Sequence, residues 1–283
     1  MNRKILVIRH SHRHLESADY LVNKIREAGI EVSEYRADDT VRLGDNPIEL
    51  VLATGGDGTM LKSAEYARQL DVPLLGINTG HMGFLTEADV ENIDQVITAV
   101  IECTWTITPR MTLDISVSGL RDGKEIQYRD WALNEAALLA TDRAHPAHMA
   151  VGIDDNAISN YGADGMIVAT PTGSTAYSFS AGGPVVWPDV EAVLVTPLAA
   201  HGLFTRPMVI SPESKLDIKI SPNQYTDLEL WCDGIRSNPV APDCEITITR
   251  GSRPIKLAQI SDTPFSGRLV HKFNLPVQGW LLP

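Results

Sequence analysis

The residues best suited to chemistry form a glycine-rich run with the sequence TGGDGT, at Thr54–Thr59. This run follows the apolar stretch Ile48–Ala53 and precedes Met60–Arg68, whose spacing of apolar residues predicts an amphipathic helix. A buried strand, a glycine turn and a helix N-terminus form a site for phosphate, because the helix end offers unpaired N–H groups and a positive dipole. The glycines also let the backbone approach a ligand closely.

An acid in the middle of this turn decides which chemistry to expect. Asp57 would repel a phosphate toward which its carboxylate pointed, but it is well placed to take a proton from a hydroxyl beside that phosphate. We therefore predict phosphoryl transfer with Asp57 as the catalytic base. The predicted phosphate-binding residues are Gly55, Gly56, Gly58 and Thr59. The alternative is an ordinary strand-to-helix turn in which Asp57 or Thr59 caps the helix.

Strands alternate with helices through the first hundred residues, which predicts a parallel sheet covered on its faces. The expected strands are Ile5–Ile8, Ile30–Tyr35, Ile48–Ala53 and Val72–Asn78, and the expected helices are Glu16–Ala28 and Val90–Glu102. Ligands bind such a sheet beyond the carboxyl ends of its strands, where the loops Arg9–His14 and Gly80–Phe84 also fall. Alternating histidines in the first loop could bind a metal, but a solvated loop is favoured because acidic and cysteine ligands are missing beside them.

From about residue 103 the apolar residues recur with period two, as in half-buried strands. The alternating segments are Thr104–Thr108, Leu113–Ser118, Leu216–Ile220 and Glu245–Thr249, with hairpin turns at Asp122-Gly123 and Asp154–Asn156. We therefore predict an α/β domain with a parallel sheet over residues 1–102, followed by a β-rich, sandwich-like domain over residues 103–258. The last segment, 259–283, contains a short helix at Phe265–Phe273 and is expected to return to the N-terminal domain.

Charge and composition exclude several classes of protein. A formal charge of −12 argues against non-specific nucleic-acid binding, which requires a basic surface. Three scattered cysteines without a CxxC spacing indicate neither a zinc site nor a disulfide framework. The apolar runs are too short for a signal peptide or a membrane span, so we expect a cytoplasmic protein without a membrane partner.

A second group of candidate binding residues lies in the β-rich region. An apolar strand breaks at Thr170-Pro171, and small residues and hydroxyls follow, with a helix expected to start near Ser174. Such a segment lets a flat ligand lie against the backbone, although a capped helix after a proline turn would use the same residues. Asn134-Glu135 stands within an apolar stretch and, if buried, must bond either its neighbours or the hydroxyls of a sugar.

Taken together, these motifs resemble the NAD kinases of bacterial type, which phosphorylate the adenosine-ribose 2′-hydroxyl of NAD. The turn around Asp57 alone is shared with phosphofructokinases and with diacylglycerol and sphingosine kinases, whereas the run TPTGSTAY at Thr170–Tyr177 is more specific. The resemblance covers nearly the whole chain and is weakest before residue 48. The order of motifs also matches, through Gly80–Thr86, Asn134-Glu135, Asp164-Gly165, Gly182–Pro184 and Arg206-Pro207.

The resemblance implies a role for each matching residue. Asp57 would act on the 2′-hydroxyl, Asn134 and Glu135 would bind ribose hydroxyls, and Asp164 would bond the nicotinamide amide, either within one subunit or across a subunit contact. The implied NAD-binding set is Gly58, Phe84, Asn134, Glu135, His145, Asp164, Thr172, Thr175, Ala176, Tyr177, Ser178, Phe179 and Ser180. The phosphate donor would be ATP, which brings Mg²⁺ with it, or polyphosphate. The resemblance also implies a homodimer or homotetramer.

Two rival functions share the glycine turn, and the first is a kinase that acts on a lipid or a sugar phosphate instead. A lipid kinase should offer an apolar entry surface, and a sugar-phosphate kinase should offer arginines for the substrate phosphate, but Thr170–Tyr177 contains neither. A non-catalytic nucleotide sensor is the second rival, and the intact Asp57 disfavours it. The chain departs from the family at Gly162, where many relatives carry a basic residue.

Overall fold

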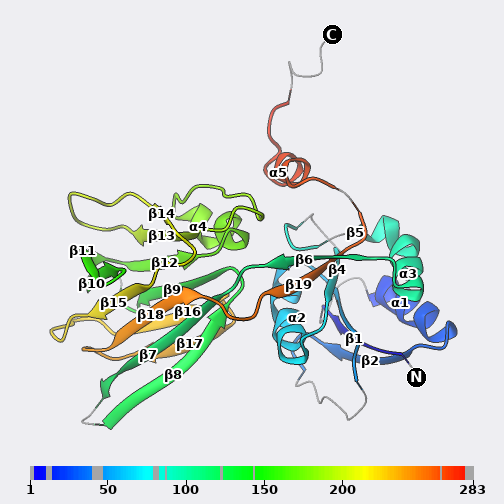
Figure 1. The fold of residues 1–283 in the computed structure, drawn as a ribbon, viewed down its shortest axis with the longest axis horizontal. Helices are drawn as coiled ribbons and strands as arrows, with labels where there is room; N and C mark the ends of the chain where they lie inside the picture. The colour runs from blue at the N-terminus through cyan, green and yellow to red at the C-terminus, as the bar shows by residue number, and fades with distance from the viewer. Residues whose placement is uncertain are drawn as a thin grey trace. The chain divides into compact units, whose positions relative to one another are not determined.

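The computed structural model describes residues 3–10, 15–39, 47–78, 83–86, 88–121, 124–142, 144–261 and 263–277. The chain divides into two units, one formed by residues 1–110 with 255–283 and the other by residues 111–254 (Figure 1). Residues 11–14 of the predicted Arg9–His14 loop, the predicted Asp122-Gly123 turn and residues 80–82 of the predicted Gly80–Phe84 loop lie outside the described residues. Within the part that is described, no helix is long and apolar enough to cross a bilayer.

The first unit is built on one sheet with the strand order β2-β1-β3-β4-β19-β6, and β5 pairs with β4. Neighbouring strands are parallel except at the β19–β6 edge. The central strands β1, β3 and β4 are buried throughout. The elements are β1 (Lys4–Arg9), α1 (Leu15–Glu27), β2 (Glu31–Arg36), β3 (Leu50–Thr54), α2 (Asp57–Leu70), β4 (Leu74–Asn78), β5 (Ala88–Asp89), a 3₁₀ turn (Val90–Asn92), α3 (Ile93–Glu102), β6 (Thr106–Arg110), β19 (Ile255–Gln259) and α5 (Phe265–Phe273).

The helices cover this sheet because their apolar residues recur with the helical period. Leu21 and Ile25 of α1 and Val96 of α3 share one core with Ile5, Leu52 and other inward residues of the central strands. Helix α2 packs against β3 and β4, where Gly76 lacks the Cβ atom that would overlap with the Met60 side chain. The predicted parallel sheet with covered faces is therefore confirmed.

The second unit is a β-sandwich of two six-stranded antiparallel sheets, with strand orders β11-β10-β15-β18-β7-β8 and β14-β13-β12-β9-β16-β17. One core draws apolar side chains from both sheets, among them Ile115, Met149, Val168 and Leu230. The elements are β7 (Leu113–Arg121), β8 (Lys124–Ala132), β9 (Glu135–Ala140), β10 (Ala147–Ile153), β11 (Asn156–Ala163), β12 (Gly165–Ala169), a 3₁₀ turn (Thr172–Thr175), α4 (Tyr177–Ser180), β13 (Val193–Leu198), β14 (Met208–Ile210), β15 (Leu216–Ile220), β16 (Leu228–Cys232), β17 (Arg236–Val240) and β18 (Glu245–Arg250).

The division of the chain differs from the boundaries expected at 102/103 and 258/259. Strands β6 and β19 belong to the first sheet, where Leu257 of β19 pairs in parallel with Leu74 and antiparallel with Thr108. The period-two pattern of Thr104–Thr108 correctly indicated a strand, but alternation does not reveal which sheet a strand joins. The structural boundaries are therefore 110/111 and 254/255.

The segment after Thr170 also differs from its expected helix near Ser174. It forms the 3₁₀ turn Thr172–Thr175 and then the single helical turn α4. Local side-chain bonds compete with a longer helix, because the Gly173 N–H donates to Thr170 Oγ1 at 3.1 Å and Ser174 Oγ donates to the Val186 carbonyl at 3.1 Å.

Candidate active site

The glycine turn joins β3 to the start of α2. Gly56 is the N-cap of this helix and Asp57 is its first residue, with no side-chain hydrogen bond capping the helix. The alternative in which Asp57 or Thr59 serves as a cap is therefore not what the structure shows. Gly55 donates its N–H to the Ile77 carbonyl at 2.9 Å, and any Cβ on it would overlap with the buried Thr59 side chain.

Gly58 keeps the start of α2 accessible to a ligand. It is exposed, and the space that a Cβ atom would fill is open. The first N–H groups of a helix have no partners within the helix, and the positive end of the dipole lies there. Gly56 and Gly58 lie at this helix end, whereas the N–H groups of Gly55 and Thr59 already donate to the Ile77 and Gly56 carbonyls, at 2.9 and 3.0 Å. The role of these four residues in binding phosphate stays a prediction.

The carboxylate of Asp57 is fixed by a different loop. Its Oδ1 accepts the N–H of Leu85 at 3.2 Å, and a Cβ atom on Gly83 would overlap with the carboxylate. Asp57 is only partly buried. The carboxyl group is therefore oriented by residues 83–85 while remaining open to solvent or substrate.

Phe84, a predicted NAD contact, packs against two aromatic residues of α5. Its ring centroid is 5.7 Å from that of Phe265 and 5.9 Å from that of Phe273, with interplanar angles of 39° and 44°. Such tilted arrangements are favourable for aromatic pairs. The C-terminal helix thus packs on the loop that carries Phe84.

In the second unit, Asn134 and Glu135 lie at the start of β9 and are each 7 % exposed. Asn134 Oδ1 and Glu135 Oε2 are buried and find no hydrogen-bond partner among the described residues. Buried polar atoms are nearly always hydrogen-bonded, so these two adjacent atoms have hydrogen-bonding capacity that the described protein does not use. This geometry fits the predicted role of both residues in binding a sugar.

A buried aspartate organises the backbone of this pair. The Asp233 carboxylate accepts the N–H groups of Leu133 at 2.9 Å, Asn134 at 2.7 Å and Glu135 at 3.3 Å. Arg236 lies 3.5 Å from the same carboxylate. Asp233 was not among the site residues predicted from the sequence, because its partners are about a hundred residues away along the chain.

Burial raises the pKa of Glu135 to about 8, and the nearby Asp233 carboxylate acts in the same direction. The N–H of Tyr177 bonds to Glu135 and opposes this shift. Glu135 is therefore mainly protonated at neutral pH in the free protein. Hydroxyl groups donating to its carboxylate would favour the ionised form.

The Thr170–Ser180 segment packs directly on Asn134-Glu135. Thr170 donates its N–H to the Asn134 carbonyl at 2.9 Å, and a Cβ atom on Gly173 would overlap with that carbonyl. Tyr177 and Phe179 are 41 % and 40 % exposed, which leaves two aromatic side chains open to a flat ligand. Ser178 is buried and shares a hydrogen bond of 3.2 Å with Thr196, so its hydroxyl has a structural partner.

The structure gathers the predicted residues Thr172, Thr175, Ala176, Tyr177, Ser178, Phe179 and Ser180 on the 3₁₀ turn and α4, beside Asn134 and Glu135. Two other predicted residues have different surroundings. Asp164 is exposed between β11 and β12. His145 is exposed, with its Nδ1 2.7 Å from Asp142 Oδ2 and its ring centroid 6.5 Å from that of Tyr225.

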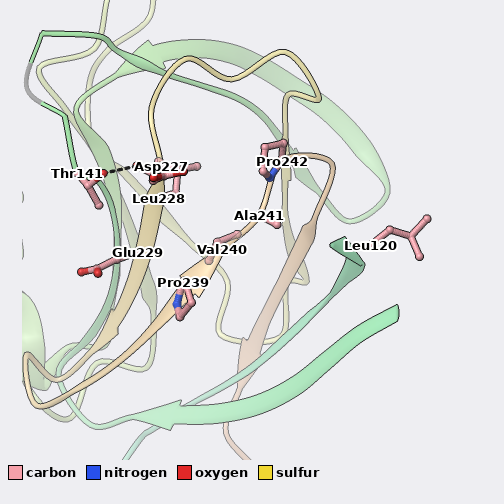
Figure 2. Close-up of a pocket in the computed structure, with 9 residues that line it drawn as sticks. All are labelled: Leu120, Thr141, Asp227, Leu228, Glu229, Pro239, Val240, Ala241 and Pro242. Atoms are coloured by element: carbon pink, nitrogen blue, oxygen red, sulfur yellow. Dashed lines mark hydrogen bonds between the residues drawn. The ribbon is translucent and has the colours of Figure 1, made fainter. Parts of the chain in front are cut away.

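The second unit also has two open hollows, of about 500 and 530 Å³. Figure 2 shows the first, beside the ends of β16 and β17, where Thr141 Oγ1 donates to the Asp227 carbonyl at 3.1 Å. The linings of both hollows lack the predicted site residues. Over the described ranges, no group of three or more His, Cys, Asp or Glu residues could hold a metal ion.

The chain therefore combines a parallel-sheet unit, which carries a glycine turn with an acid, and a β-sandwich unit. Two solved structures share this fold. Yeast NADH kinase complexed with NADH aligns with a TM-score of 0.82 and 22 % identity, over 100 % of this chain and 90 % of that chain. An Archaeoglobus fulgidus NAD kinase in complex with ATP aligns with a TM-score of 0.71 and 26 % identity, over 96 % of this chain and 100 % of that chain.

Sequence comparison identifies the family. Residues 6–104 match the ATP-NAD kinase N-terminal domain, and residues 133–260 match the ATP-NAD kinase C-terminal domain. The NAD kinase of Thermobifida fusca is 40 % identical over 99 % of this chain and 91 % of its own length. The NAD kinase of Mycobacterium leprae is 45 % identical over 92 % of this chain and 81 % of its own length. The chain belongs to the NAD kinase family.

Proposed function

We propose that this enzyme transfers the γ-phosphate of ATP to the 2′-hydroxyl of the adenosine ribose of NAD, giving NADP and ADP, with Asp57 as the catalytic base. The observation that carries the proposal is the position of Asp57 at the start of α2, where its carboxylate bonds the Leu85 N–H instead of capping the helix. Family membership supplies the substrates, and this geometry supports the role of the residue.

In the proposed step, Asp57 takes the proton of the 2′-hydroxyl while the hydroxyl oxygen forms a bond to the γ-phosphorus. The bond from that phosphorus to the bridging oxygen breaks, and ADP leaves. We assign the hydroxyl proton to Asp57 Oδ2, because Oδ1 accepts the Leu85 N–H. We assign the phosphates to the α2 N-terminus, bordered by Gly55, Gly56, Gly58 and Thr59, where the positive end of the helix dipole offsets the charge that develops in transfer. The N–H groups of Gly55 and Thr59 donate to backbone carbonyls, so these two residues shape the turn.

We assign recognition of NAD to the residues around β9. Asn134 Oδ1 and Glu135 Oε2 accept hydrogen bonds from ribose hydroxyls. These hydroxyls supply the hydrogen-bond partners that the two atoms lack among the described residues. The Thr172–Ser180 segment contacts the adenine end, and Phe84, His145 and Asp164 are assigned as further NAD contacts. Binding energy from the whole dinucleotide then aligns one hydroxyl for reaction.

Three further features belong to the same proposal. Mg²⁺ enters as part of the ATP substrate and offsets phosphate charge. The enzyme acts as a homodimer or homotetramer. Its compartment is the cytoplasm, which agrees with three cysteines in the free thiol form, because disulfides persist mainly in oxidising compartments.

The test incubates the purified enzyme with ATP, Mg²⁺ and NAD, and then measures NADP with a dehydrogenase that accepts only NADP. NADP should accumulate, and chelation of Mg²⁺ should stop it. Parallel reactions replace ATP by polyphosphate, or NAD by NADH, to define the donor and the acceptor. Absence of NADP from folded enzyme in every donor reaction would reject the proposed function.

A further inference from the structure

The loop Gly83–Thr86 contacts two different elements through alternate residues. Gly83 and Leu85 face Asp57, since the Leu85 N–H donates to the carboxylate and a Cβ atom on Gly83 would overlap with it. Phe84 contacts the aromatic rings of α5, and the Thr86 carbonyl accepts a hydrogen bond from Arg268 of α5. The loop therefore links the C-terminal helix to the proposed base.

Arg268 is unusual for its position on a short, otherwise accessible helix. It is 7 % exposed and is the only buried residue among the described side chains of α5. Arginine is rarely buried unless its guanidinium group is hydrogen-bonded, because removing this charge from water is costly. Its Nη1 donates to Thr86, which lies 182 positions away along the chain.

We propose that Arg268 is a positioning residue for phosphoryl transfer, which holds the Gly83–Thr86 loop so that Leu85 orients the carboxylate of Asp57. The inference rests on the proposed function of Asp57 as the base. Arg268 touches neither substrate in this scheme and acts through the loop. Its rigid, planar guanidinium provides directional donors that a lysine does not reproduce.

The expected kinetic effect follows because the rate of phosphoryl transfer depends strongly on the position of the group that accepts the proton. A displacement of about 1 Å at a reacting group costs on the order of 100-fold in rate. We expect Arg268→Ala to lower kcat by about 10- to 100-fold, with smaller changes in KM for NAD and ATP. Arg268→Lys should recover part of this loss, because it keeps the charge with a different donor geometry.

The decisive experiment is a double-mutant cycle between Arg268→Ala and Asp57→Asn. If Arg268 acts through Asp57, its substitution should have little further effect once the base is gone, so the two losses will not multiply. Guanidinium ion at low, non-denaturing concentration should also raise kcat of Arg268→Ala and leave Asp57→Asn unchanged. Arg250→Ala is the matched control, since Arg250 pairs with Glu191 and Glu213 in the other unit.

The outcomes separate the two proposals. Normal turnover by Asp57→Asn would reject the proposed base and leave Arg268 nothing to position. A severe loss in Asp57→Asn with parental kcat in folded Arg268→Ala would overturn the positioning role alone. Equal fold losses on Arg268 substitution in both backgrounds would also overturn it. If Arg268→Ala does not fold, Arg268→Lys takes its place in the cycle, with the same outcomes.

Discussion

The protonation of Glu135 should make NAD binding depend on pH. The free carboxyl group has a pKa of about 8 because it is buried near Asp233. In the proposed complex, ribose hydroxyls donate to this group and stabilise its ionised form, so binding should release a proton. The affinity for NAD should therefore rise with pH up to about 8 and level off above it.

The size of the effect follows from the ionised fraction. With a pKa of about 8, roughly one Glu135 in eleven is ionised at pH 7, and the apparent Kd is the intrinsic Kd divided by this fraction. The Kd at pH 7 should then be about 11-fold above its high-pH limit, or about 1.4 kcal/mol weaker. At pH 6 the difference should approach 100-fold, on the order of 2.7 kcal/mol.

Isothermal titration of NAD into enzyme without ATP measures this directly, because titration of the ATP phosphates is then absent. Glu135→Gln keeps the shape of the side chain but cannot ionise, so its Kd should be nearly flat between pH 6 and 9. Glu229→Gln, in the hollow of Figure 2, should keep the parental pH dependence. A flat parental profile, or one in which affinity falls as pH rises, would refute the assignment of an ionised Glu135.

Three substitutions test other parts of the site, and a fourth, Gly267→Ala, serves as a control. Asp57→Asn should lower kcat by about 10²- to 10⁴-fold, the usual contribution of a general base, with the Kd for NAD nearly unchanged; near-normal turnover would exclude it as the base. In Asp233→Asn, the asparagine tolerates the left-handed φ of 55°, but the buried charge is lost. Urea unfolding should therefore show a free energy of unfolding lower by about 3 kcal/mol. The pH dependence of NAD binding should move to lower pH, because Glu135 loses a neighbouring negative charge. Gly83→Ala should displace the Asp57 carboxylate and lower kcat by about 10- to 100-fold. Gly267→Ala, whose Cβ would have its nearest neighbour at 3.9 Å, should keep kcat and gain roughly 0.5–1 kcal/mol of stability, and an equal loss in both variants would contradict the steric argument.

Local signals in the sequence predicted local structure well. Asp154 and Asp155 form the tight turn between β10 and β11 with φ values of 52° and 63°, as a two-residue hairpin of this composition requires. The helix expected at Phe265–Phe273 has those bounds in the structure. Periodicity and turn residues encode such features within a few neighbouring positions, so one sequence is enough to find them.

Contacts between residues that are far apart in the sequence could not be predicted in the same way. The burial of Arg268 depends on Thr86, and the place of β6 depends on β19, each more than a hundred residues away. The sequence singled out Asn134-Glu135, but their shared acceptor Asp233 could be connected with them only through the fold. Local sequence patterns do not show which donor bonds to which acceptor when the two are far apart in the chain. The residues that support a site depend on such long-range hydrogen bonds, so they could not be predicted.

The position of β19 has a consequence for folding during synthesis. It lies between β4 and β6 in the first sheet, although residues 111–254 separate it from β6 along the chain. The ribosome must therefore release the whole sandwich before the first sheet can be completed. Until then, the short strand β5 lies against one end of that edge of β4, while the part around Leu74 that β19 will cover has no native strand against it, a state that favours aggregation. We infer that the sandwich can fold before the sheet that precedes it, which reverses the usual N-terminal-first order.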